Sequence, residues 1–114
     1  MSRAPIAVPV EIRAGKRRVY RLAYNVGEDG LTLERAAPFD DGRPVEVRFA
    51  LPLPDATVTL TLQAELQAGY NDAVDENGKR EPELGGSELA FREPSPNDVE
   101  ELRRYVKGRL TRPV

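Results

Sequence analysis

Alternation of apolar and polar residues is the feature that most limits how this sequence can fold. In its clearest instance, from Val58 to Leu66, every second residue is apolar and each residue between is threonine, glutamine or glutamate. Successive side chains of a β-strand point to opposite faces, so this period predicts a strand. One face of that strand is expected to lie in a core and the other in water.

Other stretches repeat the period, and turn residues separate them. They are residues 6–12, 17–26, 31–33, 45–51 and 89–91. Pro9 lacks a backbone donor, which predicts that the first strand lies at an edge or carries a bulge. Asp41-Gly42 predicts a turn before the stretch at 45–51, and Pro52-Leu53-Pro54-Asp55 ends it.

The strand expected at 17–26 has two unlike faces. One carries Tyr20, Leu22 and Tyr24, and the other carries Arg17 and Arg21. The first face is the more apolar, so we expect the tyrosines to point into the core. The arginines are then expected to lie on the solvated outer face of the strand.

The period changes to that of a helix near the C-terminus. Ser95-Pro96 places a serine at the cap and a proline at the first helical position, with Asp98 three residues after the serine. Helical spacing then relates Val99, Leu102, Val106 and Leu110, with Tyr105 beside them. We expect one domain over residues 1–114, with strands over about 5–92 and a helix over about 96–110. The expected fold is mainly β: a small antiparallel barrel or rolled sheet capped by the helix.

The amino-acid composition excludes several classes of function. The chain has 17 basic and 19 acidic residues, so no overall field attracts nucleic acid or an anionic membrane. It has no histidine and no cysteine, which excludes the usual general base, a thiolate nucleophile and a cysteine zinc site. No apolar run approaches the ~20 residues that span a bilayer. We expect a cytoplasmic protein that is not an enzyme, needs no cofactor and does not insert into a membrane.

Asn25 to Gly30 reads Asn-Val-Gly-Glu-Asp-Gly and is the densest candidate for binding. An asparagine amide donates and accepts hydrogen bonds, and the glycines allow a ligand to approach the backbone. The alternative is a plain turn between two strands. Arg17 and Arg21 lie ~13 Å apart along a strand, a spacing at which two arginines could hold two phosphates. The alternative for them is the solvated face described above.

The acidic stretch from Asn71 to Glu83 echoes a calcium loop. The spacing does not fit a calcium loop. With Gly78 at the sixth position, the first and twelfth positions would be Ala73 and Leu84, neither of which is a ligand. We therefore expect a loop without a metal, in which Asn77-Gly78 could form a hairpin tip.

Two other charged groups are interpreted as structural. Asp40-Asp41 is expected to serve the turn rather than a metal. The basic residues of the helix could contact nucleic acid or a partner, but nearby Glu100 and Glu101 favour a solvated face. These basic residues are Arg103, Arg104, Lys107 and Arg109.

The order and spacing of these segments resemble the PilZ domain, the bacterial receptor module for cyclic di-GMP. The resemblance rests on the turn at 25–30, the segment from Asp41 to Pro52, the Ala90-Phe91 strand after Gly-Gly, and the Ser95-Pro96 helix start. It covers nearly the whole chain. It implies a six-stranded antiparallel PilZ-like β-barrel with a C-terminal α-helix.

In that family an RxxxR arm before the first strand and a [D/N]xSxxG motif after the second hold the nucleotide. Asn25 and Gly30 match the second motif, whereas Gly27 stands in place of its serine. Arg3 is the sole arginine available for the arm. Arg17 and Arg21 spell RxxxR inside the second strand, so the arm's role is not carried over to them, although they could compensate. The candidate cyclic di-GMP ligands are thus Arg3, Arg17, Arg21, Asn25, Gly27 and Gly30.

These departures favour an adaptor of the cyclic di-GMP network that binds a protein partner and has weak or lost nucleotide binding. Its partner would belong to motility, pilus or signalling machinery. The alternative is a functional receptor that uses Asn25, Gly27, Gly30 and nearby arginines. A third class, a barrel that binds nucleic-acid polymers, needs exposed aromatics in a basic groove. Inward tyrosines and a negative net charge disfavour it, and an enzyme comes last.

Overall fold

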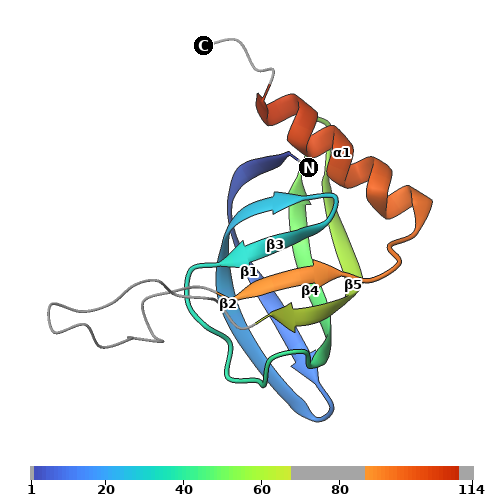
Figure 1. The fold of residues 1–114 in the computed structure, drawn as a ribbon. Coiled ribbons are helices and arrows are strands. Elements are labelled where there is room, and N and C mark those ends of the chain that lie inside the picture. Colours follow the sequence, from blue (N-terminus) through green and yellow to red (C-terminus); the bar gives the residue numbers. More distant parts are fainter. Residues whose placement is uncertain (1, 68–86, 111–114) are drawn as a thin grey trace, which may run out of the picture.

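The computed structural model describes residues 2–67 and 87–110, and within them six antiparallel strands close into a barrel (Figure 1). Around the barrel the strand order is β1-β2-β3-β6-β5-β4. The elements are β1 (Arg3–Ala14), β2 (Arg17–Gly27), β3 (Gly30–Leu33), β4 (Pro44–Pro52), β5 (Thr57–Gln67), β6 (Glu88–Phe91) and α1 (Pro96–Leu110). The predicted six-stranded antiparallel barrel with a C-terminal helix is confirmed.

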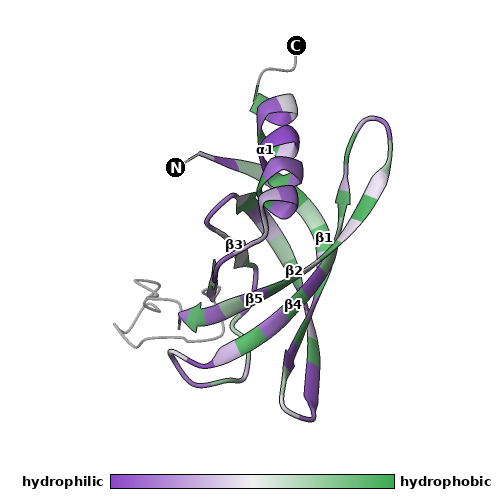
Figure 2. Ribbon diagram, turned by 90° about the vertical axis from the view of Figure 1, so that its right-hand side faces the viewer, coloured by the Kyte–Doolittle hydropathy of each residue, from purple (hydrophilic) through white to green (hydrophobic). Residues whose placement is uncertain are grey.

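The core lies inside the barrel and is built by the alternation seen in the sequence. In β4 and β5 the inward residues are buried and those between them are mostly exposed. Figure 2 shows the hydrophobic and hydrophilic residues alternating along the strand ribbons. In the closed barrel every strand has a hydrogen-bonded neighbour on each side, although β1 pairs with β4 over Glu11–Arg13 only.

Strand β1 accommodates Pro9 in two ways that the sequence left open. A register shift against β2 lies between Pro5 and Val8, which places a bulge before the proline. Strand β1 also pairs with β4 only over Glu11–Arg13, so Pro9 has a neighbouring strand on one side alone. A residue without an N–H is tolerated at such a position.

The predicted orientation of β2 is wrong. Tyr20, Leu22 and Tyr24 are 58%, 39% and 49% exposed, whereas Ala23 and Val26 are buried. Two buried residues three positions apart cannot both face inward in a regular strand. A register shift between Ala23 and Asn25 against β3 resolves the conflict, because a bulge turns the strand by one residue. The more apolar face is therefore the outer one.

Helix α1 lies across one end of the barrel, beside the start of β1 (Figure 1). The Ser95 hydroxyl accepts a hydrogen bond from the Asp98 amide at 3.1 Å, which is the predicted cap. Leu102, Tyr105 and Val106 are buried against the barrel, as predicted. Leu110 is 54% exposed, so its predicted place on the buried face is wrong. The Tyr105 hydroxyl donates to the Pro5 carbonyl at 2.5 Å. Burial raises the pKa of this hydroxyl, although the charge of Arg109 acts in the other direction.

Two of the helix arginines tie α1 to the barrel rather than forming only a solvated face. Arg103 donates to Glu28 at 2.8 and 3.1 Å, which joins the helix to the turn after β2. Arg104 donates to Asp55 at 3.0 Å in the turn between β4 and β5. The interpretation of these residues as purely solvated is thus corrected.

The turn before β4 forms as predicted: the Arg43 amide donates to the Asp40 carbonyl at 3.1 Å, and Gly42 has a φ of 82°. The acidic stretch 71–83 and its Asn77-Gly78 lie outside the described residues. Among the residues that are described, no helix is both long and apolar enough to cross a membrane. The same residues hold no group of three or more side chains able to bind a metal ion.

Candidate functional site

The start of β1 lies against the end of β2, on the outer surface of the barrel. In the register of the two strands Arg3 is opposite Gly27, and Pro5 is opposite Asn25. Between these pairs, Ala4 and Val26 face each other and are fully buried. Because strand residues alternate, Arg3 and Asn25 both face outward. Arg3 is therefore part of the first strand, not of an arm that precedes it.

The guanidinium of Arg3 is the centre of a polar cluster. Its Nε and Nη2 donate to the two oxygens of Asp29 at 2.9 and 3.3 Å. Its Nη1 donates to the Asn25 Oδ1 at 2.8 Å and to the Thr32 Oγ1 at 3.3 Å. Its Nη2 also donates to the Glu88 Oε2 at 3.3 Å. A guanidinium has five N–H donors, and these five hydrogen bonds account for all of them.

The charges of the cluster reinforce one another. Burial works against the charged form of Arg3, but the hydrogen bond to Asp29 and the charges of Glu88 and Asp29 outweigh it and raise the pKa of the guanidinium. Burial likewise opposes ionisation of Asp29, yet the hydrogen bond and charge of Arg3 hold the pKa of this carboxyl below its ordinary 3.8. Two carboxylates surround one arginine, so the cluster as a whole carries a net negative charge.

The start of β1 passes close to Gly27. A Cβ built at this position would be 2.6 Å from the Ser2 carbonyl oxygen and 2.9 Å from the Arg3 Cδ. Real Cβ atoms do not approach backbone so closely, so no serine fits here while the start of β1 keeps this path. The glycine that replaces the motif serine is thus required by the packing of this chain.

Gly30 has a similar role on the other side of the cluster. A Cβ there would lie 2.2 Å from the Leu89 carbonyl oxygen, across the pairing of β3 with β6. This glycine permits the two backbones to approach, and no side chain is available to contact a ligand.

Arg17 and Arg21 do not join the cluster. Arg17 is opposite Ala14 at the far end of the hairpin, where its guanidinium lies 5.5 Å from the centre of the Phe39 ring and donates to the Pro38 carbonyl. Arg21 donates to the Ala36 carbonyl at 3.1 Å. Both arginines fasten the connection between β3 and β4 to β2. Arg17 is exposed and Arg21 is half-buried, so Arg17 remains in contact with solvent as one of the two interpretations expected.

Asp29, Thr32 and Glu88 are cluster members that the sequence interpretation missed. Asp29 lies between the motif residues, so its position beside Asn25 and Gly30 was a usable signal. Thr32 is brought near by the pairing of β2 with β3, where it is opposite Asn25. Glu88 is opposite Thr32 in β6, and its Oε1 accepts a hydrogen bond from the Thr32 hydroxyl at 2.5 Å. Only the closure of the barrel brings Glu88 to a site that begins at residue 3.

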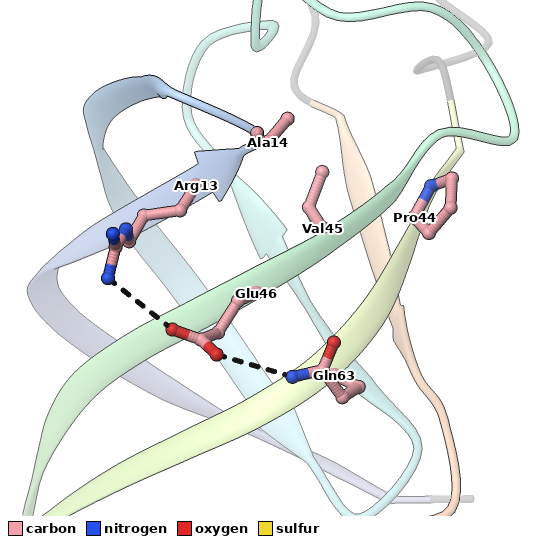
Figure 3. A pocket seen from close by; sticks show the side chains of 7 residues that line it. Arg13, Ala14, Pro44, Val45, Glu46 and Gln63 are labelled. Carbon is pink, nitrogen blue, oxygen red and sulfur yellow. Dashed lines mark hydrogen bonds and ion pairs between the residues drawn. The ribbon is translucent and has the colours of Figure 1, made fainter.

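A concave surface of about 350 Å³ lies at the opposite end of the barrel from the Arg3 cluster. Figure 3 shows Arg13 pointing toward Glu46, which also accepts a hydrogen bond from Gln63. The Arg13–Glu46 separation is 3.9 Å, and the surface is open to solvent. Its groups satisfy one another across β1, β4 and β5, and none of the motif residues lines it.

The Arg3–Asp29 pair predicts a dependence of stability on pH. The folded-state pKa of Asp29 is lowered, so its stabilisation is present above the unfolded pKa and is lost as the pH falls through the folded value. We expect Asp29→Asn to reduce the acid-induced loss of stability below about pH 4. At pH 7 the variant should be less stable by up to about 1 kcal/mol, the range of a partly exposed pair. Urea unfolding at pH 7 and pH 3 measures both effects, and unchanged acid sensitivity would contradict the assignment.

Comparison with known proteins identifies the fold. No protein-family model matches the sequence, and no curated protein matches it. Among solved structures, the Bacillus subtilis inhibitor of motility MotI/DgrA superposes with a TM-score of 0.75 at 22% identity, over 97% of this chain and 51% of that one. The PilZ domain of CeSA from a cellulose-synthesizing bacterium superposes with a TM-score of 0.59 at 18% identity, over 95% of this chain and 97% of that one.

These likenesses show that the chain has a PilZ-like fold. The chain spans about half the length of the Bacillus protein. Identities this low describe the course of the backbone and not the chemistry of the site, which has to be judged from the residues around Arg3.

Proposed function

We propose that this chain is a PilZ-like adaptor of the cyclic di-GMP network, with weak or lost nucleotide binding and a protein as its partner. The observation that carries the proposal is the saturation of Arg3. All five of its donors are engaged within the chain, and two of its partners are carboxylates. A dianionic nucleotide would have to displace Asp29 and Glu88 from the arginine and then remain close to both.

Two further observations support the loss of binding. The motif serine is replaced by Gly27, over which the start of β1 passes. Arg17 and Arg21, which spell RxxxR, are engaged with the connection after β3 and donate to no residue of the cluster around Arg3. Charged hydrogen bonds contribute about 1.5–3 kcal/mol each, so these losses together correspond to two or more orders of magnitude in affinity.

The remaining parts of the proposal follow from the same residues. A chain without histidine or cysteine and with this fold is proposed to be a cytoplasmic binding protein and not an enzyme. The likeness to a motility inhibitor favours a partner from motility or a related surface machinery. A nucleic-acid polymer is not proposed as the partner, because the net charge is negative.

Isothermal titration with cyclic di-GMP tests the proposal. We expect a Kd above about 1 mM, which corresponds to less than about 4 kcal/mol of binding free energy. At about 100 μM protein such weak binding gives no measurable heat. The alternative, a functional receptor, predicts saturable binding that Asn25→Ala abolishes and that Arg21→Ala leaves unchanged. That result would overturn the proposal and would place the nucleotide in the cluster around Arg3.

A further inference from the structure

The outer face of β2 carries an exposed apolar stripe that no described segment of the chain covers. The described residues include four large exposed hydrophobic side chains, and three of them, Tyr20, Leu22 and Tyr24, follow one another on this face. We call them the tyrosine stripe. Exposed Pro9 lies opposite Leu22 and extends the apolar surface onto β1. Single exposed hydrophobics are ordinary, but a contiguous group rich in tyrosine is typical of an interface.

The side chains of the tyrosine stripe are supported by neighbouring groups before any partner binds. The Tyr20 hydroxyl donates to Glu11 on the neighbouring strand at 3.2 Å, which orients the ring. Tyr20 and Leu22 lie where β2 pairs with β1, and Tyr24 lies where β2 also pairs with β3, so hydrogen-bonded backbone supports all three side chains. A preordered aromatic surface loses little side-chain entropy when it binds.

The two ends of the stripe have opposite charge. Before it, at the tip of the β1–β2 hairpin, lie Arg13, Lys16 and Arg18, which Glu11 and Glu46 neutralise only in part. After it lie Glu28 and Asp29, which pair with Arg103 and Arg3. Each of these arginines is shared with a second carboxylate, Glu100 or Glu88, so this end keeps a net negative charge. Lys16 and Glu28 flank β2, each six residues from Leu22, and six extended residues span about 20 Å.

We propose that the tyrosine stripe is the interface of a symmetric dimer of this chain. A two-fold axis through Leu22 places Tyr20 of one copy against Tyr24 of the other, because the tyrosines are equidistant from it. The same two-fold rotation places the cationic hairpin tip of each copy beside the acidic turn of the other copy. The dimer therefore contains two such contacts. An isologous interface needs such self-complementarity, and the symmetric order Tyr20, Leu22, Tyr24 with oppositely charged ends provides it.

Sedimentation equilibrium of the chain at concentrations up to about 200 μM tests the proposal, with a dimer expected. Leu22→Glu should raise the dimer Kd by about 100-fold or more, since the axis brings two carboxylates together in an apolar contact. Leu110→Glu is the matched control, because it places the same charge on an exposed leucine outside the stripe and should leave the dimer unchanged.

A charge exchange tests the register. Lys16→Glu and Glu28→Lys each create like-charge contacts in their own dimer, and each alone should weaken it. Glu28→Lys also removes the ion pair with Arg103, so the heterodimer and not this single variant decides the register. Mixing the two variants restores both opposite-charge contacts, so a heterodimer tighter than either homodimer is expected. Failure of this rescue would overturn the proposed register.

Three results would overturn the dimer itself. The first is a monomer at every concentration, and the second is a dimer that survives Leu22→Glu. The third is a monomer that binds a labelled single-stranded oligo(dT) in a manner sensitive to Tyr20→Ala, which would assign the stripe to nucleic acid. None of these outcomes bears on the nucleotide titration, because the stripe lies outside the cluster around Arg3.

Discussion

Replacement of Gly30 by alanine is expected to lower the free energy of unfolding by about 3 kcal/mol or more. The new Cβ would lie 2.2 Å from the Leu89 carbonyl oxygen and 3.2 Å from the Leu89 carbonyl carbon. Both atoms belong to the backbone of β6, which pairs with β3 through Gly30 and Ala90. A backbone cannot rotate aside as a side chain can. The two strands must therefore separate, and the barrel opens between β3 and β6.

Gly108→Ala provides the matched control. Gly108 lies within α1, and a Cβ there meets nothing within 4 Å. The same substitution should therefore stabilise the chain by up to about 1 kcal/mol, the helix-propensity difference between the two residues. Urea unfolding of both variants measures the contrast. Equal and small effects at the two positions would show that β3 and β6 do not approach as closely as described.

This contrast separates two explanations of Gly30. Its match to a nucleotide-binding motif suggests a backbone approached by a ligand, whereas the structure gives it a direct packing role. A variant that loses stability supports the packing role and does not depend on whether a nucleotide binds.

The double substitution Asp29→Asn with Glu88→Gln is expected to create measurable binding of cyclic di-GMP. The amides keep the size of the side chains but remove two negative charges that hold the Arg3 guanidinium. The cluster then changes from net negative to net positive. Freeing a guanidinium to pair with phosphate is worth about 1.5–3 kcal/mol, which corresponds to a gain of roughly ten- to a hundredfold in affinity. Isothermal titration detects the gain as saturable heat that the natural chain lacks.

Two further variants show whether the gain arises at this site. Arg3→Ala added to the double variant should abolish the binding, because it removes the only arginine of the cluster. Glu11→Gln with Glu46→Gln removes the same total charge at the opposite end of the barrel and should leave the nucleotide unbound. If the second pair produced the same gain, net charge rather than the release of Arg3 would explain it.

The fold was largely predictable because it depends on local patterns. Period-two alternation marks which residues can face a core, and proline and glycine turns mark where each strand ends. The helix start was equally local, since Ser95 caps an amide only three residues away. The pattern did not settle how the sheet closes, because pairing β3 with β6 joins residues that are far apart in sequence.

The site was predictable only where it followed a contiguous motif. Of the residues in the polar cluster, Asn25 was selected from the motif, and Arg3 was selected because it lies ahead of the other residues of the first strand. Asp29 lay within the motif but was missed, because the motif says nothing about its charge. Thr32 and Glu88 could not have been found, since strand pairing alone brings them to Arg3.

The prediction of the orientation of β2 was wrong for a physical reason. The choice between its faces rested on apolar content, which favoured the side with Tyr20 and Tyr24. A bulge between Ala23 and Asn25 changes which residues face inward, and small Ala23 is preferred inside a crowded barrel. Hydropathy does not report a register shift, because the shift depends on the neighbouring strand.

The sequence by itself determined the class of fold, the order of its elements and the chemistry that is missing, because alternation, turns, caps and composition are local properties. The tertiary structure alone decided which face of β2 meets water, which side chains surround Arg3 and why Gly27 cannot be a serine. These features arise from strand register and barrel closure, which place residues far apart in the chain within hydrogen-bonding distance. The carboxylates that occupy Arg3 are the clearest case, since one lies 26 residues from it and the other 85.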